Sequence, residues 1–582
     1  MSAIKDKLKD YLIGDVLRVV EASPDDGIIP GSLDKTLLDL LNYDIWIEGE
    51  KYILTKSFEA DPFIRSINKL FDTGKFTKFY KRFILQYIFC LAGVLANQSV
   101  GGKIKEIALE ENEINCYVAD YYFRATGRDP RIVWKKRSMF VGFLQIFVNI
   151  FIQAALSLKS GFKLSKGIKQ FKLLREGLWG LYDTGGAYFH DDFLVDGEKI
   201  RNDDLLLFSW GISKNDFYRR KAYDDARKSP YSHFDIKKLS IGLKSFILRI
   251  MPKYVFFSTA YLLSYLGSNN FSFYRSAFLS FSISAIPYEK VFSHYRFTST
   301  LGHMFFSTSH IAESIICENY NSRYYLMHWS DVSYKDHRPF LSHMGCDKFL
   351  GWGKIHLDGL NVETLSSGYV FKRFIKNVAR DKSTILTQMG VSAGKKIISF
   401  FDESFSALCR MTSRHYVNFW ELAYHCALDN PGCEIIIKTK NPQMPNSLEP
   451  ELYSIFAELS EKMKKLSNVH IIDEKRFSFI EAIGVADIVI TEGMTSSATI
   501  AIICGITGLY FDEAGYDHPL KERFKGRIVF DDPLKLRNMI SSIIAGKEDP
   551  LKEIPESLLR EYDEYSDDRG IDIFREVISK GL

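Results

Sequence analysis

Cysteine, charge of one sign and internal repetition are all scarce in this chain of 582 residues. The eight cysteines are scattered and lack the paired spacing of zinc ligands, so we expect reduced thiols in a cytoplasmic protein. A formal net charge of only +4 argues against a dedicated nucleic-acid binder. The chain has no low-complexity segment and no repeat, which argues against a disordered chain or a solenoid.

Long apolar runs are also few. Residues 1–15 are charged and amphipathic, so we expect no signal peptide. The run 139–158 has the length of a membrane span, but Gln145, Asn149 and Gln153 would place three amides on one stripe of a helix. This pattern favours a buried or surface-lying helix over a true span, and both interpretations stay open.

A second apolar run, 246–267, is interrupted by Pro252 and Lys253. Basic residues flank both runs, which would suit a protein that rests on the inner face of the cytoplasmic membrane. The alternative for either run is the core of a domain.

What the chain has is enough apolar sequence for large cores. Hydrophobic residues make up 46% and charged residues 25%, and the length predicts two to four domains. Aromatic residues reach 14%, which is typical of interfaces, sugar-stacking surfaces or a membrane-facing region.

The N-terminal residues predict an irregular, mostly helical region. Within it, 44–54 alternates in a way that predicts a hairpin turning at Gly49. The run 84–95 is apolar but too short to span a bilayer. From residue 111 onward the pattern becomes α/β, and 113–119 could be a first strand.

Two stretches of this α/β half carry candidate site residues. In the first, Gly185 and Gly186 precede His190 and Asp191, so the backbone could approach a ligand beside charged groups. An Asp196-Gly197 turn between short extended segments and a buried strand at 205–210 follow.

The second stretch begins with a helix predicted over 301–319. A strand predicted over 323–329 ends at His328, and a polar loop with Asp331 follows it. Open α/β sheets bind ligands at the carboxyl ends of their strands, so His328 or Asp331 could remove a proton from an acceptor hydroxyl. A further strand is predicted over 347–353.

After a helical and polar bridge, strands and helices alternate regularly, which predicts a parallel sheet covered by helices on both faces. Several strand ends carry polar groups: Asp402, Lys438, Lys440 and Glu492. The predicted strands cover 396–401, 434–440, 468–473, 487–491 and 506–511, and the predicted helices cover 413–428, 452–466 and 478–485.

The stretch 487–512, DIVITEGMTSSATIAIICGITGLYFD, is central to the analysis. A buried strand ends at Glu492 and Gly493, and Thr495, Ser496 and Ser497 open an apolar helix that ends at Gly505. Free N–H groups and the helix dipole at such a helix start favour a bound anion. A plain β-α-β unit with ordinary caps is the alternative.

Taken together, the sequence predicts an α/β protein with two doubly wound, Rossmann-like domains that face a cleft, and extra N-terminal helices. We expect the charged helical tail to fold back across the domains. The predicted parts are a helical region at 1–110, an acceptor-side domain at 111–370, a linker at 371–395, a nucleotide-sugar-binding domain at 396–545 and a helical tail at 546–582.

Residues 396–530 resemble the donor-binding domain of GT-B glycosyltransferases of the bacterial surface-polysaccharide, capsule and teichoic-acid type. The resemblance lies in EIIIKTKNP, DIVIT, TSS and CGITGLYFD. It implies a glycosyltransferase that moves a sugar from a nucleotide-sugar donor to a growing surface glycan or a lipid-linked acceptor such as capsule or lipopolysaccharide. It also implies that Thr495, Ser496 and Ser497 hold the donor phosphate, that Lys438 neutralises it, and that Glu492 lies near the sugar or ribose.

With dipoles and a cation at the phosphate, we expect no metal and no cofactor beyond the donor. The expected location is cytoplasmic, and peripheral at the membrane's inner face. Two alternatives stay open, namely a sugar-nucleotide 2-epimerase and a non-catalytic, membrane-associated protein of polysaccharide assembly or export.

Overall fold

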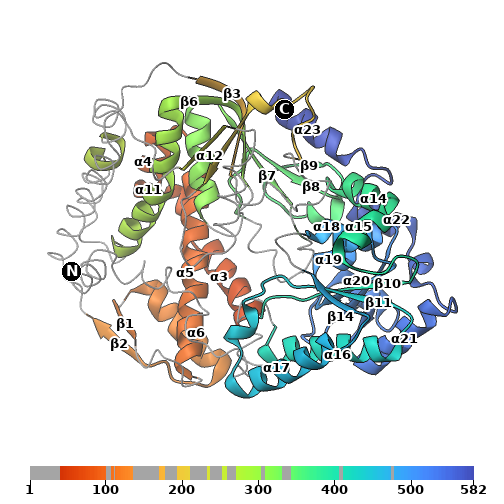
Figure 1. Ribbon diagram of the computed structural model, residues 1–582. Helices are drawn as coiled ribbons and strands as arrows, with labels where there is room; N and C mark the ends of the chain where they lie inside the picture. Colours follow the sequence, from red (N-terminus) through yellow and green to blue (C-terminus); the bar gives the residue numbers. More distant parts are fainter. Residues whose placement is uncertain are drawn as a thin grey trace, which may run out of the picture.

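The computed structural model contains two parallel β-sheets with helices around them (Figure 1). It describes residues 40–99, 107–110, 112–135, 169–176, 193–209, 232–235, 252–257, 271–302, 308–328, 330, 343–405, 411–472 and 477–582. The predicted α/β architecture with two doubly wound sheets is confirmed by the two strand orders given below.

The first sheet has seven parallel strands in the order β5-β4-β3-β6-β7-β8-β9. Its chain order reverses between β3 and β6, as in a doubly wound fold. The strands are β3 (Lys169–Glu176), β4 (Leu205–Ser209), β5 (Ser232–Asp235), β6 (Tyr295–Gly302), β7 (Arg323–Met327), β8 (Lys348–Gly351) and β9 (Glu363–Ser366).

The second sheet has six parallel strands in the order β12-β11-β10-β13-β14-β15. Its central strands are runs of Ile, Val and Phe buried on both faces, as expected for a sheet covered by helices on each side. The strands are β10 (Ile397–Phe401), β11 (Glu434–Lys438), β12 (Val469–Ile472), β13 (Ile488–Glu492), β14 (Thr507–Phe511) and β15 (Val529–Phe530).

The helices predicted over 413–428, 452–466 and 478–485 are confirmed, each starting within two residues of the predicted start. Thr412 accepts the His415 N–H and caps one helix, and Ser478 and Glu481 form a capping box on another. The helices are α16 (Ser413–Asp429), α17 (Pro450–Lys464), α18 (Phe479–Gly484), α19 (Ser496–Ile503), α20 (Pro519–Phe524) and α21 (Pro533–Ile544).

The N-terminal region is helical, but two predicted details are wrong. The predicted hairpin at 44–54 is a helix, α3 (Ile45–Leu54), and Gly49 is a contact between helices, since a Cβ there would lie 2.9 Å from Leu85 Cδ2. The strand predicted at 113–119 is also a helix, α6 (Glu113–Thr126), because Asn112 caps its start. The other N-terminal elements are α4 (Pro62–Leu70), α5 (Lys75–Ser99), β1 (Ile107–Glu110) and β2 (Ile132–Lys135).

One helix of this region has the length and apolar composition of a membrane span. Among the described residues, Lys75–Ala96 of α5 is the one helix long and apolar enough to cross a membrane, and 89% of its apolar window is buried inside the protein. Phe281 of α11 (Phe271–His294) packs edge-on against Phe71, Phe76 and Phe79. Much of the aromatic content therefore fills the core between these helices and the first sheet.

The helix predicted over 301–319 is shorter than expected. Residues 301 and 302 end strand β6, and α12 covers only Ser309–Asn319.

The Asp196-Gly197 turn is confirmed. Gly197 has a φ of +80°, and Asp196 Oδ1 accepts the N–H of Glu198 and of Lys199, but residues 193–200 form no strand. The run 139–158 lies outside the described residues, as does 246–267 apart from 252–257.

Two further segments join the domains. The linker contains α14 (Lys372–Arg380) and α15 (Lys382–Met389), so part of the predicted polar loop at 387–394 is helical. The tail contains α22 (Glu556–Tyr562) and α23 (Gly570–Lys580). In Figure 1, α23 lies against the first sheet, where Ser299 Oγ donates to Ile578 O at 2.6 Å, so the predicted return of the tail is confirmed.

Candidate functional site

The order in which the chain adds strands to the second sheet reverses between β10 and β13, which lie side by side at its centre. The chain runs outward from β10 through β11 to β12 and then crosses back to β13. Ligands of such sheets bind beyond the carboxyl ends of the strands at this point. Phe401 is in register with Thr491, so the next residues, Asp402 and Glu492, end the two strands next to each other.

The chain turns from β13 into α19 through Gly493, whose φ of +63° is in the left-handed region that favours glycine. Thr495 is the N-cap in extended conformation, and its side chain makes no capping hydrogen bond. The first-turn N–H groups of a helix have no partner within the helix, and they attract anions. Thr495, Ser496 and Ser497 are half-buried at this opening, so their hydroxyls and these N–H groups can meet a ligand.

A hydrogen-bond network links the neighbouring strand ends. The Glu403 N–H donates to Glu492 Oε2 at 2.8 Å, and the Lys440 N–H donates to Asp402 Oδ1 at 2.5 Å. The Lys440 ammonium pairs with the Glu403 carboxylate. The structure thus brings together the predicted residues Asp402, Lys440 and Glu492.

Lys438 is the last residue of β11, the strand beside β10. Its side chain is half-buried, and its Nζ donates to Thr439 O at 2.9 Å. It lies close enough to Asp402 to stabilise the charged form of that carboxyl. The ammonium is therefore at the same edge of the sheet as the opening of α19.

Two carboxyl groups at this edge have raised pKa values. Burial raises the pKa of Asp402 to about 7, against the opposing effects of the Lys440 N–H and the Lys438 charge. Burial also raises the pKa of Glu492 well above its usual range, and the neighbouring Asp402 carboxyl adds to that rise. Among the described residues, Glu492 Oε1 has no hydrogen-bond partner, and Asp402 interacts with the Tyr416 hydroxyl.

Sequence reasoning missed several residues of this edge. Asp512 directly follows β14, accepts the Gly515 and Tyr516 N–H groups, and pairs with Lys521 at 2.5 Å. It follows a predicted strand just as Asp402 does, so the same rule could have found it. Tyr416 reaches the two carboxyls from α16, and no sequence signal marks it.

His328 follows β7 in the first sheet, as predicted, but it is only 1% exposed. Its ring lies 4.2 Å from that of His356, and its carbonyl accepts the Trp352 Nε1–H at 2.7 Å. Its role as a base stays a prediction. Asp331, His190 and Asp191 lie outside the described residues, so their roles stay predictions as well.

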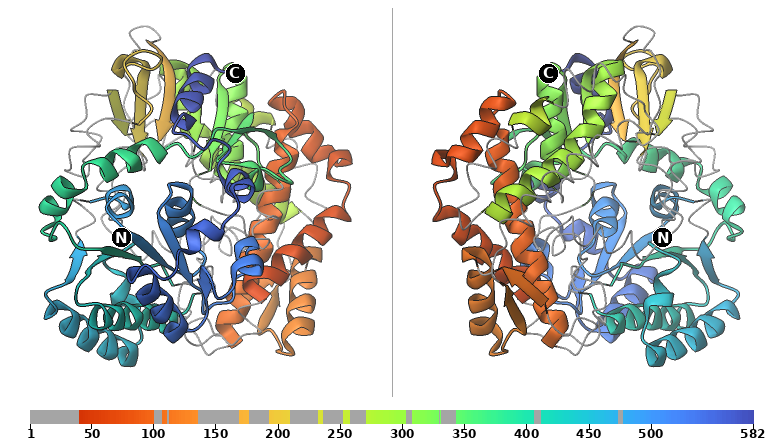
Figure 2. Two further views of the ribbon diagram at one scale, coloured as in Figure 1. Left: turned by 90° about the vertical axis from the view of Figure 1, so that its right-hand side faces the viewer. Right: turned by 90° about the vertical axis from the view of Figure 1, so that its left-hand side faces the viewer.

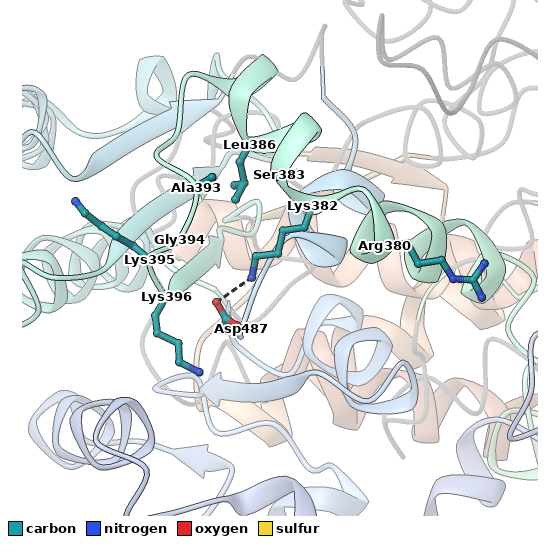
Figure 3. Close-up of a pocket in the computed structure, with 9 residues that line it drawn as sticks. All are labelled: Arg380, Lys382, Ser383, Leu386, Ala393, Gly394, Lys395, Lys396 and Asp487. Carbon is teal, nitrogen blue, oxygen red and sulfur yellow. Dashed lines mark hydrogen bonds and ion pairs between the residues drawn. The ribbon is translucent and has the colours of Figure 1, made fainter.

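A cavity of about 520 Å³ lies at the opposite, amino-terminal edge of the second sheet. Figure 3 shows that Lys382 meets Asp487 there, at 3.0 Å, whereas Arg380 and Lys395 point away from each other. The cations of this cavity do not converge on one point, so we place the candidate site at the carboxyl edge. The lining residues are Arg380, Lys382, Ser383, Leu386, Ala393, Gly394, Lys395, Lys396 and Asp487.

In the part of the chain that the structure describes, no three His, Cys, Asp or Glu side chains gather as a metal site. No family model matches the sequence, and no curated protein matches it.

The comparison with solved structures finds GT-B glycosyltransferases and one epimerase, at low identity and low TM-score. The chain is similar to the wall teichoic acid polymerase TagF, at 11% identity and a TM-score of 0.43, over 76% of this chain and 97% of that chain. It is similar to an α,α-trehalose-phosphate synthase (UDP-forming) from Burkholderia vietnamiensis, at 9% identity and a TM-score of 0.38, over 70% of this chain and 98% of that one.

It is also similar to a protein assigned as a UDP-N-acetylglucosamine 2-epimerase from Listeria monocytogenes, at 9% identity and a TM-score of 0.39, over 70% and 94% of the two chains. Similarities this distant do not show that this chain shares the activity of any of these proteins. The fold assignment rests on the strand orders.

Proposed function

We propose that this protein is a metal-independent glycosyltransferase that moves a sugar from a nucleotide-sugar donor to a surface glycan or lipid-linked acceptor. One observation carries the proposal. At the switch point of the second sheet, the opening of α19, the Lys438 ammonium and the buried carboxyls Asp402 and Glu492 share one edge. A phosphate at the helix start and a hydroxyl-bearing group at the carboxyls is the ligand that fits this edge best.

In the proposed reaction, the bond between the sugar's anomeric carbon and the donor phosphate breaks, and the acceptor oxygen forms the new bond. The leaving phosphate gains charge, which the N–H groups at the start of α19 and the Lys438 ammonium would stabilise. A base of the first domain, Asp331 or His328, takes the proton of the acceptor hydroxyl.

A nucleotide panel tests the donor site. We expect UDP, CMP, GDP or CDP conjugates to stabilise the protein against heat, by about 2.7 kcal/mol at a concentration of 100 times the Kd. Ser496→Ala should weaken that stabilisation, whereas Ser383→Ala, at the opposite edge of the same sheet, should not. If no conjugate stabilises the protein, the non-catalytic scaffold becomes the better account. Product formed without an acceptor would favour the epimerase.

We further propose that the protein rests on the inner face of the cytoplasmic membrane through the tip formed by α6 and β2. Phe123, Val133 and Trp134 are each more than two-fifths exposed there, beside the exposed Arg124 and Arg131. In both views of Figure 2 this segment lies at the lower margin of the molecule. Tryptophan and arginine suit an anionic lipid interface.

Sedimentation with lipid vesicles tests this surface. The protein should bind vesicles rich in phosphatidylglycerol, and replacing both Val133 and Trp134 with serine should weaken binding about a hundredfold or more. Burying each side chain is worth about 1.5–3 kcal/mol, and about 1.4 kcal/mol corresponds to a tenfold change in Kd. Leu534→Ser, which changes an even more exposed apolar residue of α21, is the control. Equal binding of both variants, or equal binding to neutral vesicles, would contradict the proposal.

A further inference from the structure

Asp402 and Glu492 are an unusual pair to find beside a phosphate site. They end the adjacent strands β10 and β13, and their side chains are 6% and 1% exposed. Each carboxyl uses one oxygen, Oδ1 of Asp402 for the Lys440 N–H and Oε2 of Glu492 for the Glu403 N–H. The other oxygen of Glu492, Oε1, has no hydrogen-bond partner among the described residues, whereas Asp402 also interacts with the Tyr416 hydroxyl.

A buried polar atom without a partner costs free energy, so it is commonly completed by a ligand, a water or a proton. The unpartnered oxygen of Glu492, whose side chain is 1% exposed at the switch point, therefore points to a ligand at this place. Two adjacent buried carboxylates also repel each other, and such pairs hold a proton in common.

The charged and titratable groups around the pair come from five elements. The chain beyond β10 brings Glu403 and the chain beyond β14 brings Glu513, and both add negative charge. The end of β11 brings Lys438, the loop after it brings Lys440, and α16 brings Tyr416. Lys440 is paired with Glu403.

Asp512 lies at the end of the next strand, where it is paired with Lys521 and also faces His415. The positive charge of Lys438 acts on Asp402 and opposes the rise of its pKa. If both carboxyls of the pair ionised, negative charge would dominate this edge.

We propose that the donor's phosphate binds only when the Asp402–Glu492 pair is protonated, so that nucleotide binding takes up a proton. This inference rests on the proposed function. A carboxylate of the pair takes H⁺ from solvent, which removes a negative charge that would repel the phosphate at the nearby helix start. The resulting carboxylic acid can still hydrogen-bond the hydroxyl-bearing group of the ligand. Binding of the anion in turn holds that proton in place.

The pH dependence of binding follows from this linkage. Burial raises the pKa of Asp402 to about 7 in the free protein, so the pair loses a proton as the pH rises above neutral. The phosphate itself has its second pKa near 6 and is fully ionised above pH 7. The Kd for UDP should therefore rise between pH 7 and pH 9, by up to about tenfold per pH unit for one proton.

Titration calorimetry of the full chain with UDP and with inorganic pyrophosphate tests the proposal. The double variant Asp402→Asn/Glu492→Gln keeps both hydrogen-bond acceptors but cannot ionise, so its Kd should be flat from pH 7 to pH 9. Glu313→Gln is the matched control, because Glu313 is a buried carboxyl of the first domain whose pKa burial also raises to about 7. Its Kd should keep the slope of the wild type.

A second measurement needs no variant. For the wild type at pH 8, the binding heat should change with the ionisation enthalpy of the buffer and report uptake of up to one proton per bound UDP. Binding without a pH slope and without proton uptake would overturn the inference and leave the donor site standing. A slope that survives in the double variant would also overturn it. No binding at any pH would overturn both the inference and the proposed function.

Discussion

Replacing Asp563 with alanine is expected to destabilise the protein by about 3–5 kcal/mol, because it leaves the Lys372 ammonium buried without a counter-charge. The two side chains are 3% and 6% exposed and lie 2.6 Å apart. Asp563 Oδ1 also accepts the Tyr369 N–H at 2.9 Å. The pair therefore fastens the segment of the tail between α22 and α23 to the start of α14.

Urea denaturation of the variants measures this effect. The double variant Lys372→Met/Asp563→Leu removes both charges, so it should lose less stability than Asp563→Ala alone. Glu576→Ala, which breaks the exposed pair with Lys580, is the control and should leave the midpoint unchanged. A loss under about 1 kcal/mol for Asp563→Ala would show that the pair is solvated and does not fasten the two segments.

Lys438→Ala should lower kcat/KM for sugar transfer by about 10²–10³, the effect of removing one preorganised group that stabilises developing charge. Ser496→Ala should cost about 10-fold to 100-fold, since a hydrogen bond to a charged group is worth about 1.5–3 kcal/mol. Lys438 ends β11 and Ser496 is the first residue of α19, so the two variants test the proposed donor site from two different elements.

Two controls sit at the opposite edge of the same sheet. Lys396→Ala and Ser383→Ala change the same residue types in the amino-terminal cavity and should keep wild-type transfer. Full activity of both Lys438→Ala and Ser496→Ala would make the donor assignment wrong. A loss in all four variants would indicate damage to the fold of the second domain.

The second domain could be predicted well because local signals agree there. Short Ile-rich and Val-rich runs predicted every strand from β10 to β14, and the regular alternation with helical runs placed the helices between them. The polar strand ends predicted to gather at one edge do so at Asp402, Lys440 and Glu492. The roles of these residues in binding stay predictions.

The N-terminal errors have physical causes. In α3 the buried residues are Ile45, Trp46, Gly49, Tyr52 and Ile53, a helical spacing that a reading by alternation missed. Gly49 suggested a turn, but it is small because α5 approaches closely. Such an approach is a contact between segments far apart in sequence, which no local pattern encodes.

The surroundings of His328 could not be predicted for the same reason. Its partners Trp352 and His356 come from the neighbouring strand and the loop beyond it, and Tyr562 of the tail packs on His356. The tail approaches so closely that a Cβ on Gly353 would lie 2.4 Å from Glu561 O. This packing joins segments that are about two hundred residues apart in the sequence, so no local pattern could predict it.

Hydrogen exchange with and without UDP-sugar donors or pyrophosphate tests the central claim most directly. If the start of α19 binds the donor phosphate, the backbone amides from Gly493 to Thr499 should exchange more slowly in the complex. The exchange rates of the amides around Ser383 and Lys396, which line the opposite cavity, should not change. Slower exchange at the cavity with no change from Gly493 to Thr499 would contradict the account.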